Sequence, residues 1–259
     1  MFDYKKLEEE GYFIMPNQIS NELIEKLKES LDVSFEKHNL IQKQQGNEIE
    51  IKGVALNVLP DSPDYIELLQ ELIDNKIIEN LENHFFKSKF ILNSLSALDN
   101  QPNKSNFSAI IHRDIKCYSG ELPIMINILV MLDDFTIENG ATRLLPYSHK
   151  IEEKCTDEFY YKNSIQAVGK AGDILFFNSN VWHSSAINTT QKRRRAIPIT
   201  FSKSFVKQLM DYPRCLGYDI KNEFTKDMAQ LLGYDSRVPA NLYEWYQPFE
   251  NRFYKKEQD

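Results

Sequence analysis

Three residues of this chain could together hold a metal ion: His112 and Asp114, two positions apart, and His183 much later in the sequence. Side chains two residues apart on a β-strand point to the same face, so a strand here predicts that His112 and Asp114 project together. Two imidazoles and one carboxylate can hold Fe(II) on one side and leave positions open for a cosubstrate and O₂. A His-x-Asp pair alone is a weak signal, because a hydrogen-bonded surface pair has the same spacing.

The elements that position these residues are predicted from the spacing of apolar side chains. Helical spacing indicates an amphipathic helix over 19–37, which Ser20 or Asn21 could cap, and a second helical region over 64–86. A Ser- and Asn-rich stretch over 100–108 is predicted to be a loop. Short apolar runs bounded by turn signals then predict strands over 107–115, 124–132, 141–145, 172–177 and 193–202.

This order of elements predicts an α+β, mainly β fold. Helices followed by strands favour antiparallel sheets with the helices packed on one face. We expect a single domain over 1–259, with a helical support over 1–90, a barrel core over about 91–203 and a helical, aromatic cover over 204–259. No linker separates the cover from the core.

Composition narrows the class of protein further. The chain has 259 residues and a net charge of -7, which does not favour nucleic acid or an anionic membrane as a partner. Its three cysteines are widely spaced and form no metal-binding or disulfide pattern. The beginning of the sequence is charged where a signal peptide would be apolar. We therefore expect a cytoplasmic protein; the oligomeric state stays open.

Several motifs together resemble the phytanoyl-CoA dioxygenase family of Fe(II)/2-oxoglutarate oxygenases. They are the His-x-Asp pair, the block Asn139-Gly-Ala-Thr-Arg-Leu-Leu-Pro-Tyr-Ser-His149, the run Gly172-Asp-Ile-Leu-Phe-Phe177, the distal His183 and a basic residue eleven positions later. Glu10-Gly-Tyr-Phe-Ile14 also looks like the opening of that family. The resemblance covers roughly 7–203, and it says little about the substrate.

The resemblance implies a double-stranded β-helix, a jelly-roll of the cupin type, with Fe(II) held by His112, Asp114 and His183. It implies an enzyme that uses 2-oxoglutarate and O₂, releases succinate and CO₂, and oxidises an unactivated C–H bond of a small-molecule metabolite. Halogenating relatives lack the carboxylate ligand, so Asp114 favours hydroxylation. Desaturation and cyclisation use the same oxidant and stay open.

A cation must hold the distal carboxylate of 2-oxoglutarate, and Arg194 stands where the resemblance places it. The strand pattern agrees, because Ile197 and Ile199 are bulky and suit the helix-packed face, which turns Arg194 toward the interior. Arg193 and Arg195 are then expected at a solvated edge. The resemblance also places Ser185 and Asn127 on the cosubstrate; a satisfied core amide is the alternative for Asn127.

Two other classes of protein remain open at this point. One is a jelly-roll protein that binds a metal or ligand without turnover, although degenerate relatives usually lose a metal ligand or the arginine. The other is a zinc hydrolase with the same ligands, which has no use for a buried Arg194. We expect Arg113 to point away from the metal, His149 and Trp182 to be structural, and the substrate-binding residues to stay unassigned among Tyr118, Arg143 and the C-terminal tyrosines.

Overall fold

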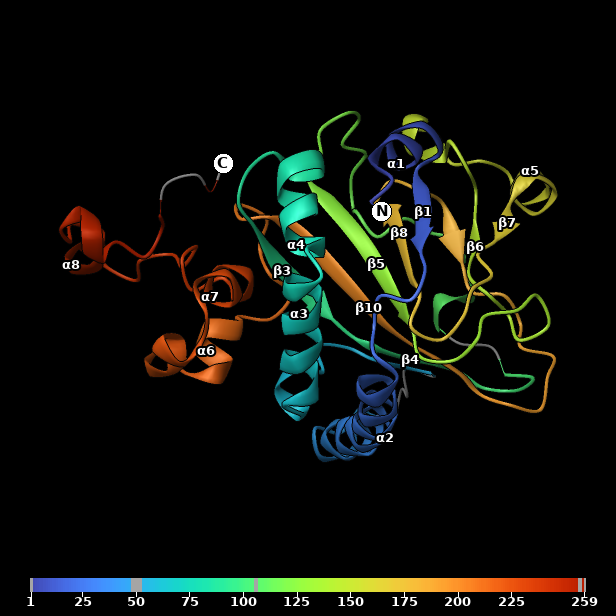
Figure 1. The fold of residues 1–259 in the computed structure, drawn as a ribbon, viewed down its shortest axis with the longest axis horizontal. Coiled ribbons are helices and arrows are strands. Elements are labelled where there is room, and N and C mark those ends of the chain that lie inside the picture. Colours follow the sequence, from blue (N-terminus) through green and yellow to red (C-terminus); the bar gives the residue numbers. More distant parts are fainter. Residues whose placement is uncertain (1, 48–52, 105–106, 256–257, 259) are drawn as a thin grey trace.

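A large antiparallel sheet forms the centre of the computed structural model, which describes residues 2–47, 53–104, 107–255 and 258 (Figure 1). Within these residues the sheet has seven strands in the order β1-β8-β5-β10-β4-β2, and β3 pairs with the later part of β10. The bounds are Tyr12–Met15 (β1), Val54–Ala55 (β2), Phe90–Leu95 (β3), Ala97–Asn100 (β4), Met125–Met131 (β5), Ile174–Asn178 (β8) and Arg194–Lys203 (β10).

A smaller sheet lies beside the large one and consists of β7 (Ile165–Gln166), β6 (Arg143–Leu144) and β9 (His183–Ser184), in that order. Apolar side chains from both sheets meet in one buried cluster, which includes Leu129 and Ala196 from the large sheet and Leu144 from the small one. Two antiparallel sheets enclosing a core confirm the predicted jelly-roll architecture.

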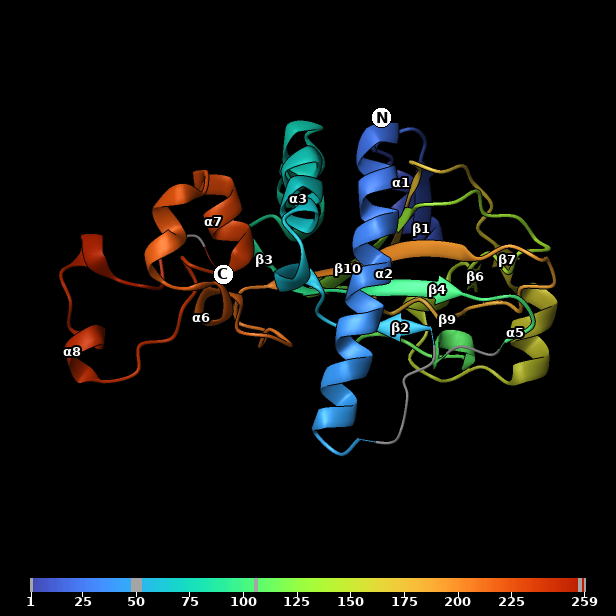
Figure 2. The same cartoon turned by 90° about the horizontal axis from the view of Figure 1, so that it is seen from below.

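Helices cover the other face of the large sheet, as predicted. They are α2 (Asn21–Gln44), α3 (Asp64–Asp74), α4 (Ile77–Asn80) and a π-helix over Leu81–Phe86. Ser20 caps α2 by accepting a hydrogen bond from the backbone N–H of Leu23. Leu27 and Leu31, one turn apart on the buried face of α2, pack into the same core as the outward-facing β-branched and aromatic side chains of β5, β8 and β10. Figure 2 shows α2 crossing β4.

The remaining helices are peripheral. Their bounds are Tyr4–Glu10 (α1), Asp157–Asn163 (α5), Tyr212–Leu216 (α6), Lys226–Leu232 (α7) and Leu242–Trp245 (α8), with short 3₁₀ turns at Leu59–Asp61, Phe107–Ala109, Ser148–Lys150, Asp219–Glu223 and Phe249–Asn251. Helix α7 packs on β3 and α3, whereas α8 projects from the body (Figure 1). No helix in the described part of the chain is long and apolar enough to cross a membrane.

One predicted strand is wrong. The stretch 107–115 contains the 3₁₀ turn Phe107–Ala109 and then only an isolated bridge between His112 and His183. The run of apolar residues before His112 suggested a strand, but Ile110 is exposed and irregular backbone follows the bridge. The loop predicted over 100–108 includes residues 105 and 106, which lie outside the described residues.

The other predicted elements are confirmed with shifted ends, and several strands went unrecognised. Helix α2 runs seven residues beyond the predicted end at residue 37, and a left-handed Lys76 divides the region 64–86. Strands β3 and β4 were not predicted, because Asn93, Ser94 and Ser96 interrupt their apolar pattern. Strands β1 and β2 lie within 1–90 yet join the large sheet. The three segment boundaries themselves stay a prediction.

Candidate metal centre

The side chains of His112, Asp114 and His183 converge, so that one possible ligand atom from each lies within 4.8 Å of the others. The Nε2 atom of His112 is 3.4 Å from Oδ1 of Asp114, and the Nε2 atom of His183 is 3.5 Å from Oδ2. His183 is buried and the other two are partly exposed. The three residues thus form a compact donor set with one side open.

The backbone brings the two histidines together by direct pairing. His112 N–H donates to the carbonyl of His183 at 3.0 Å, and His183 N–H donates to the carbonyl of His112 at 3.0 Å. His183 begins β9, while Asp114 follows the bridge in irregular backbone. The same-face argument for a continuous strand was therefore wrong in its mechanism, although the predicted residues do come together.

Hydrogen bonds fix the orientation of both rings. Nδ1 of His112 lies 2.7 Å from the carbonyl of Ile110, and Nδ1 of His183 lies 3.1 Å from the carbonyl of Val181. A carbonyl oxygen can only accept, so each Nδ1 donates the hydrogen bond, and each Nε2 has a free lone pair when its ring is neutral. Outer hydrogen bonds of this kind orient metal-binding histidines. Both Nε2 atoms face Asp114, and both are available as ligands.

The protonation states also suit a metal. Burial lowers the pKa of His183 to about 4, despite the opposing charge of Asp114. Burial alone would raise the pKa of Asp114, but the neighbouring His183 and His112 hold it below its ordinary value. Near neutral pH the site therefore offers a neutral His183 and an ionised Asp114. Two nitrogens and one carboxylate oxygen form the donor set typical of non-heme Fe(II) with open positions.

Arg194 is fully buried, and its three guanidinium nitrogens have no hydrogen-bond partner within the described residues. Its Cζ atom lies 4.3 Å from the ring centroid of Phe135. Burial lowers its pKa to about 10, which still leaves it charged near neutral pH, and the charges of Asp133 and Asp99 partly offset the effect. A buried, unpaired guanidinium is costly unless an anion completes it. Arg194 therefore fits the distal carboxylate of a dicarboxylate such as 2-oxoglutarate.

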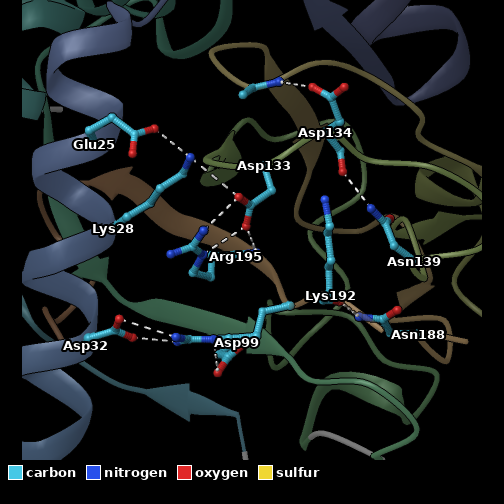
Figure 3. Close-up of polar contacts among 12 residues, drawn as sticks. Glu25, Lys28, Asp32, Asp99, Asp133, Asp134, Asn139, Asn188, Lys192 and Arg195 are labelled. Atoms are coloured by element: carbon cyan, nitrogen blue, oxygen red, sulfur yellow. Dashed lines mark hydrogen bonds and ion pairs between the residues drawn. The ribbon is translucent and has the colours of Figure 1, made fainter. Parts of the chain in front are cut away.

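The neighbouring arginines, one residue before and after Arg194 on β10, are both paired with carboxylates. Figure 3 shows Arg195 against Asp133. Arg193 donates to Asp32 on α2 at 2.5 Å and to Asp99 on β4 at 3.1 Å. Arg195 makes three hydrogen bonds to Asp133, each of 2.9 Å, one of them from its backbone N–H. As predicted, Arg194 lies in a different environment from Arg193 and Arg195. The latter two form ion pairs, however, and are not part of a simple solvated turn.

Ser185 and Asn127 both line the cavity beside the metal ligands. The Ser185 hydroxyl lies 2.8 Å from that of Ser108. The Asn127 amide donates to Ser179 at 3.0 Å and accepts from Thr200 at 2.8 Å. Protein groups therefore supply hydrogen-bond partners for both the nitrogen and the oxygen of this amide. The argument that Asn127 needs a bound ligand to satisfy its amide is therefore wrong. Contact of either residue with a cosubstrate stays a prediction.

Arg113 fixes the backbone of the loops around the candidate metal centre. The Arg113 guanidinium donates to the carbonyls of Asn180, Ser148 and Glu152 at 2.6, 2.9 and 2.8 Å, and to that of Ile151. It also lies over the ring of Trp182, 4.3 Å from its centroid, which agrees with the packing role predicted for the tryptophan. Arg113 is thus a clamp on the loop after β6.

His149 is structural in a similar way. Its Nε2 lies 3.1 Å from the carbonyl of Glu8, and its ring lies so close to Gly11 that a Cβ there would come within 2.5 Å of Nδ1. The backbone of Gly11, with a φ of 90°, also favours glycine. His149 therefore joins α1 to the small-sheet side of the barrel and takes no part in the metal set.

A cavity of about 620 Å³ opens onto the metal ligands. Tyr118, Arg143 and the C-terminal tyrosines are not among its lining residues in the described chain. The lining instead includes residues that were not singled out from the sequence: Asn93 and Ser94 of β3, Ser96 between β3 and β4, Lys116, and Phe205, Val206, Lys207 and Leu209. The available signal was that three of the four residues 93–96 are polar.

Comparison with known proteins identifies the family to which this chain belongs. Residues 7–196 match the phytanoyl-CoA dioxygenase (PhyH) family, and the chain belongs to that family. A Mycobacterium tuberculosis protein, the uncharacterized Rv1501, is 33% identical over 196 residues, which cover 76% of this chain and 69% of that protein.

Solved structures share the fold at low sequence identity. The non-heme alpha-ketoglutarate-dependent carbocyclase SnoK from nogalamycin biosynthesis aligns with a TM-score of 0.58 and 16% identity, over 77% of this chain and 82% of SnoK. EvdMO1 aligns with a TM-score of 0.58 and 18% identity, but the aligned part spans only 49% of that chain. These matches support the jelly-roll fold.

Proposed function

We propose that this protein is an Fe(II)- and 2-oxoglutarate-dependent oxygenase that oxidises an unactivated C–H bond of a small-molecule metabolite. Hydroxylation is the expected outcome, since Asp114 keeps the carboxylate in the ligand set. The carbocyclisation named for SnoK keeps ring closure open as a second outcome of the same chemistry.

The buried and unpaired Arg194 is the observation that carries this proposal. Arg194 stacks on Phe135, and His183 lies 4.8 Å from Phe177 between ring centroids. Phe135 and Phe177 belong to one buried cluster between the two sheets. The metal candidate and Arg194 therefore both contact this cluster, although Arg194 is not among the residues that line the cavity. A molecule with a chelating end and a carboxylate end would join them.

Each residue then has a definite task. His112, Asp114 and His183 would hold the iron, Arg194 would pair with the distal carboxylate of 2-oxoglutarate, and Ser185 and Asn127 would contact the cosubstrate. Iron and 2-oxoglutarate, when bound, supply the oxidation of a C–H bond by O₂ with release of succinate and CO₂. The surrounding apolar walls exclude water and hold the substrate against this centre.

The rival functions make less use of the same residues. A zinc hydrolase needs no unpaired cation in the barrel, and a binding protein without turnover would not need an intact metal set together with Arg194. We further propose a cytoplasmic enzyme whose partner is its small-molecule substrate; the three cysteines are free in the structure.

The first test loads the purified protein anaerobically with Fe(II) and 2-oxoglutarate, and then measures succinate after admission of air. We expect slow succinate release even without substrate. Asp114→Ala removes one of three ligands, so we expect iron binding and succinate release to fall at least tenfold together. Full retention of both in this variant would refute the ligand assignment.

A matched control is Arg214→Ala, which removes an exposed arginine on α6 and should change neither measurement. Metal analysis of the protein as isolated, and reconstitution with Zn(II), separate the rivals. Turnover of an ester with Zn(II) and no response to 2-oxoglutarate would favour the hydrolase.

A further inference from the structure

The cavity continues beyond the space that a cosubstrate would use. In the sheet register, Asn127 of β5 pairs with Thr200 of β10 on one side and with Phe177 of β8 on the other. The ring of Phe177 contacts the ring of His183. The metal ligands therefore lie near the level of Thr200. Arg194 stands toward the start of β10, while the cavity also reaches the segment 205–209 beyond its end. We assign the part of the cavity beyond Thr200, away from Arg194, to a substrate.

The walls of the cavity are mainly apolar. They include Leu56, Ile115, Met125, Phe205, Val206 and Leu209. Leu56, Phe205 and Leu209 are also strongly exposed, so they border the opening as well as the interior. Exposed large apolar side chains around one opening mark a surface that apolar ligands can cover. A carbon-rich body therefore fits here better than a sugar or a nucleotide.

Apart from the candidate metal ligand Asp114, the charged side chains that line the cavity are positive. Among the described residues that line the cavity, Asp114 is the only carboxylate, while Lys116 and Lys207 supply two exposed cationic side chains. Neither lysine lies within ion-pair distance of another described residue, although the charge of Lys116 acts on Asp114 and His112. The chain as a whole carries a net charge of -7, so the local positive charge runs against the average. Such a rim favours an anionic ligand over a cationic one.

Lys207 lies in a segment that β3 fixes in place. The Asn93 side chain donates to the carbonyl of Lys207 at 3.0 Å, and the carbonyl of Asn93 accepts from the N–H of Leu209 at 3.2 Å. Asn93 is itself buried and also donates to Ser202 at 3.2 Å. The lysine backbone is thus held at the opening, and only its side chain needs to adjust to a ligand.

We propose that the substrate is a lipophilic small molecule with one anionic group, which lies against Lys116 and Lys207 while its apolar body extends toward the metal. This inference rests on the proposed function for the identity of the chemistry, but binding can be measured without turnover.

The test compares three probes of one chain length, decanoate, 1-decanol and decylammonium, by calorimetric titration of the protein loaded with Zn(II) and 2-oxoglutarate. We expect decanoate to bind about tenfold more tightly than decanol, since two partly solvated ion pairs act together, and decylammonium to bind most weakly. Lys207→Gln and the double variant with Lys116→Gln should progressively remove the preference for decanoate. Added salt should weaken it as well.

The control is the double variant Lys43→Gln and Lys162→Gln, which removes the same charge from α2 and α5 away from the cavity and should keep the preference. Equal binding of the three probes, or an undiminished preference in the Lys116/Lys207 variant, would overturn the inference. The same titration with metal-free protein separates the two proposals. Decanoate selectivity without any binding of 2-oxoglutarate would uphold the charge inference while the oxygenase proposal failed.

Discussion

Arg194 is the residue that best distinguishes this interior from a passive core. Its guanidinium is fully buried, and its nitrogens find no partner among the described residues, whereas both neighbouring arginines are paired with carboxylates. The ligand-free folded protein therefore already bears the desolvation free energy of the buried Arg194 guanidinium. A dicarboxylate that pairs with this charge would recover that cost as binding energy, which is the physical basis for the proposed role of Arg194.

Replacing Arg194 by Met should separate stability from binding. Met fills much of the same volume without a charge, so we expect the melting temperature of the ligand-free protein to stay unchanged or to rise by a few degrees. Millimolar 2-oxoglutarate with Zn(II) should raise the melting temperature of the wild type and not that of the variant. Thermal scans with and without 2-oxoglutarate check both points, and equal stabilisation of the two proteins would show that Arg194 is not the anchor.

At the scale of elements, ion pairs of the residues on both sides of Arg194 hold β10 to the helical layer. Figure 3 shows Asp133 between Arg195 and Lys28 of α2. Asp133 accepts from the backbone and the side chain of Arg195 and lies 3.5 Å from Lys28 on α2. Asp32 on α2 holds Arg193. Because these contacts fix the backbone before and after Arg194, they also fix where its side chain enters the barrel.

Asp133→Asn should therefore weaken 2-oxoglutarate binding only by shifting the position of the Arg194 side chain. We expect KM for 2-oxoglutarate to rise about three- to tenfold with little change in kcat, because the anchor shifts while the metal ligands stay in place. Asp134→Asn, a more exposed carboxylate paired with Lys170, is the control. A fall in kcat with unchanged KM would point to a general loss of structure instead.

The same carboxylate gives a pH signature in stability. Burial alone would raise the pKa of Asp133, but its bonds with Arg195 hold it below its ordinary value of 3.8. A depressed folded-state pKa contributes stability above that ordinary value, and this contribution is lost as the pH falls through the folded pKa. The difference in unfolding free energy between wild type and Asp133→Asn should be full near pH 7 and should shrink below about pH 4.

At the scale of the whole molecule, the segment after β10 joins the helical layer to the barrel. Helix α7 packs on β3 and α3, and the buried Tyr212 hydroxyl accepts a hydrogen bond from the N–H of Leu95 at 3.2 Å. The same hydroxyl lies 3.3 Å from the Asn57 side chain, to which it donates. One residue of the tail thus ties together β3 and the chain that follows β2.

Tyr212→Phe should lower the unfolding free energy by about 1–3 kcal/mol, because the Leu95 N–H stays buried and loses its partner. Denaturant unfolding measures this difference directly. Tyr243→Phe changes a strongly exposed tyrosine of α8 and should have no effect. Equal midpoints for all three proteins would show that water replaces the lost bond.

Sequence by itself determined the identity of the chemical groups and the class of the fold. The spacing of apolar side chains was enough for α2, β5, β8 and β10, because amphipathic periodicity is a local property. The triad residues and Arg194 were also predicted from their order along the chain, with the help of the family pattern.

Only the tertiary structure decided how these groups meet. His112 and His183 pair through backbone hydrogen bonds between segments far apart in sequence, in place of the predicted strand. Partners for Asn127 and Arg195, and the cavity wall from 93–96 and 205–209, likewise come from distant elements. Such contacts depend on which strands become neighbours, and local spacing carries no information about that choice. The unpaired state of Arg194 has the same origin, since a missing partner is defined only when every neighbour is in place.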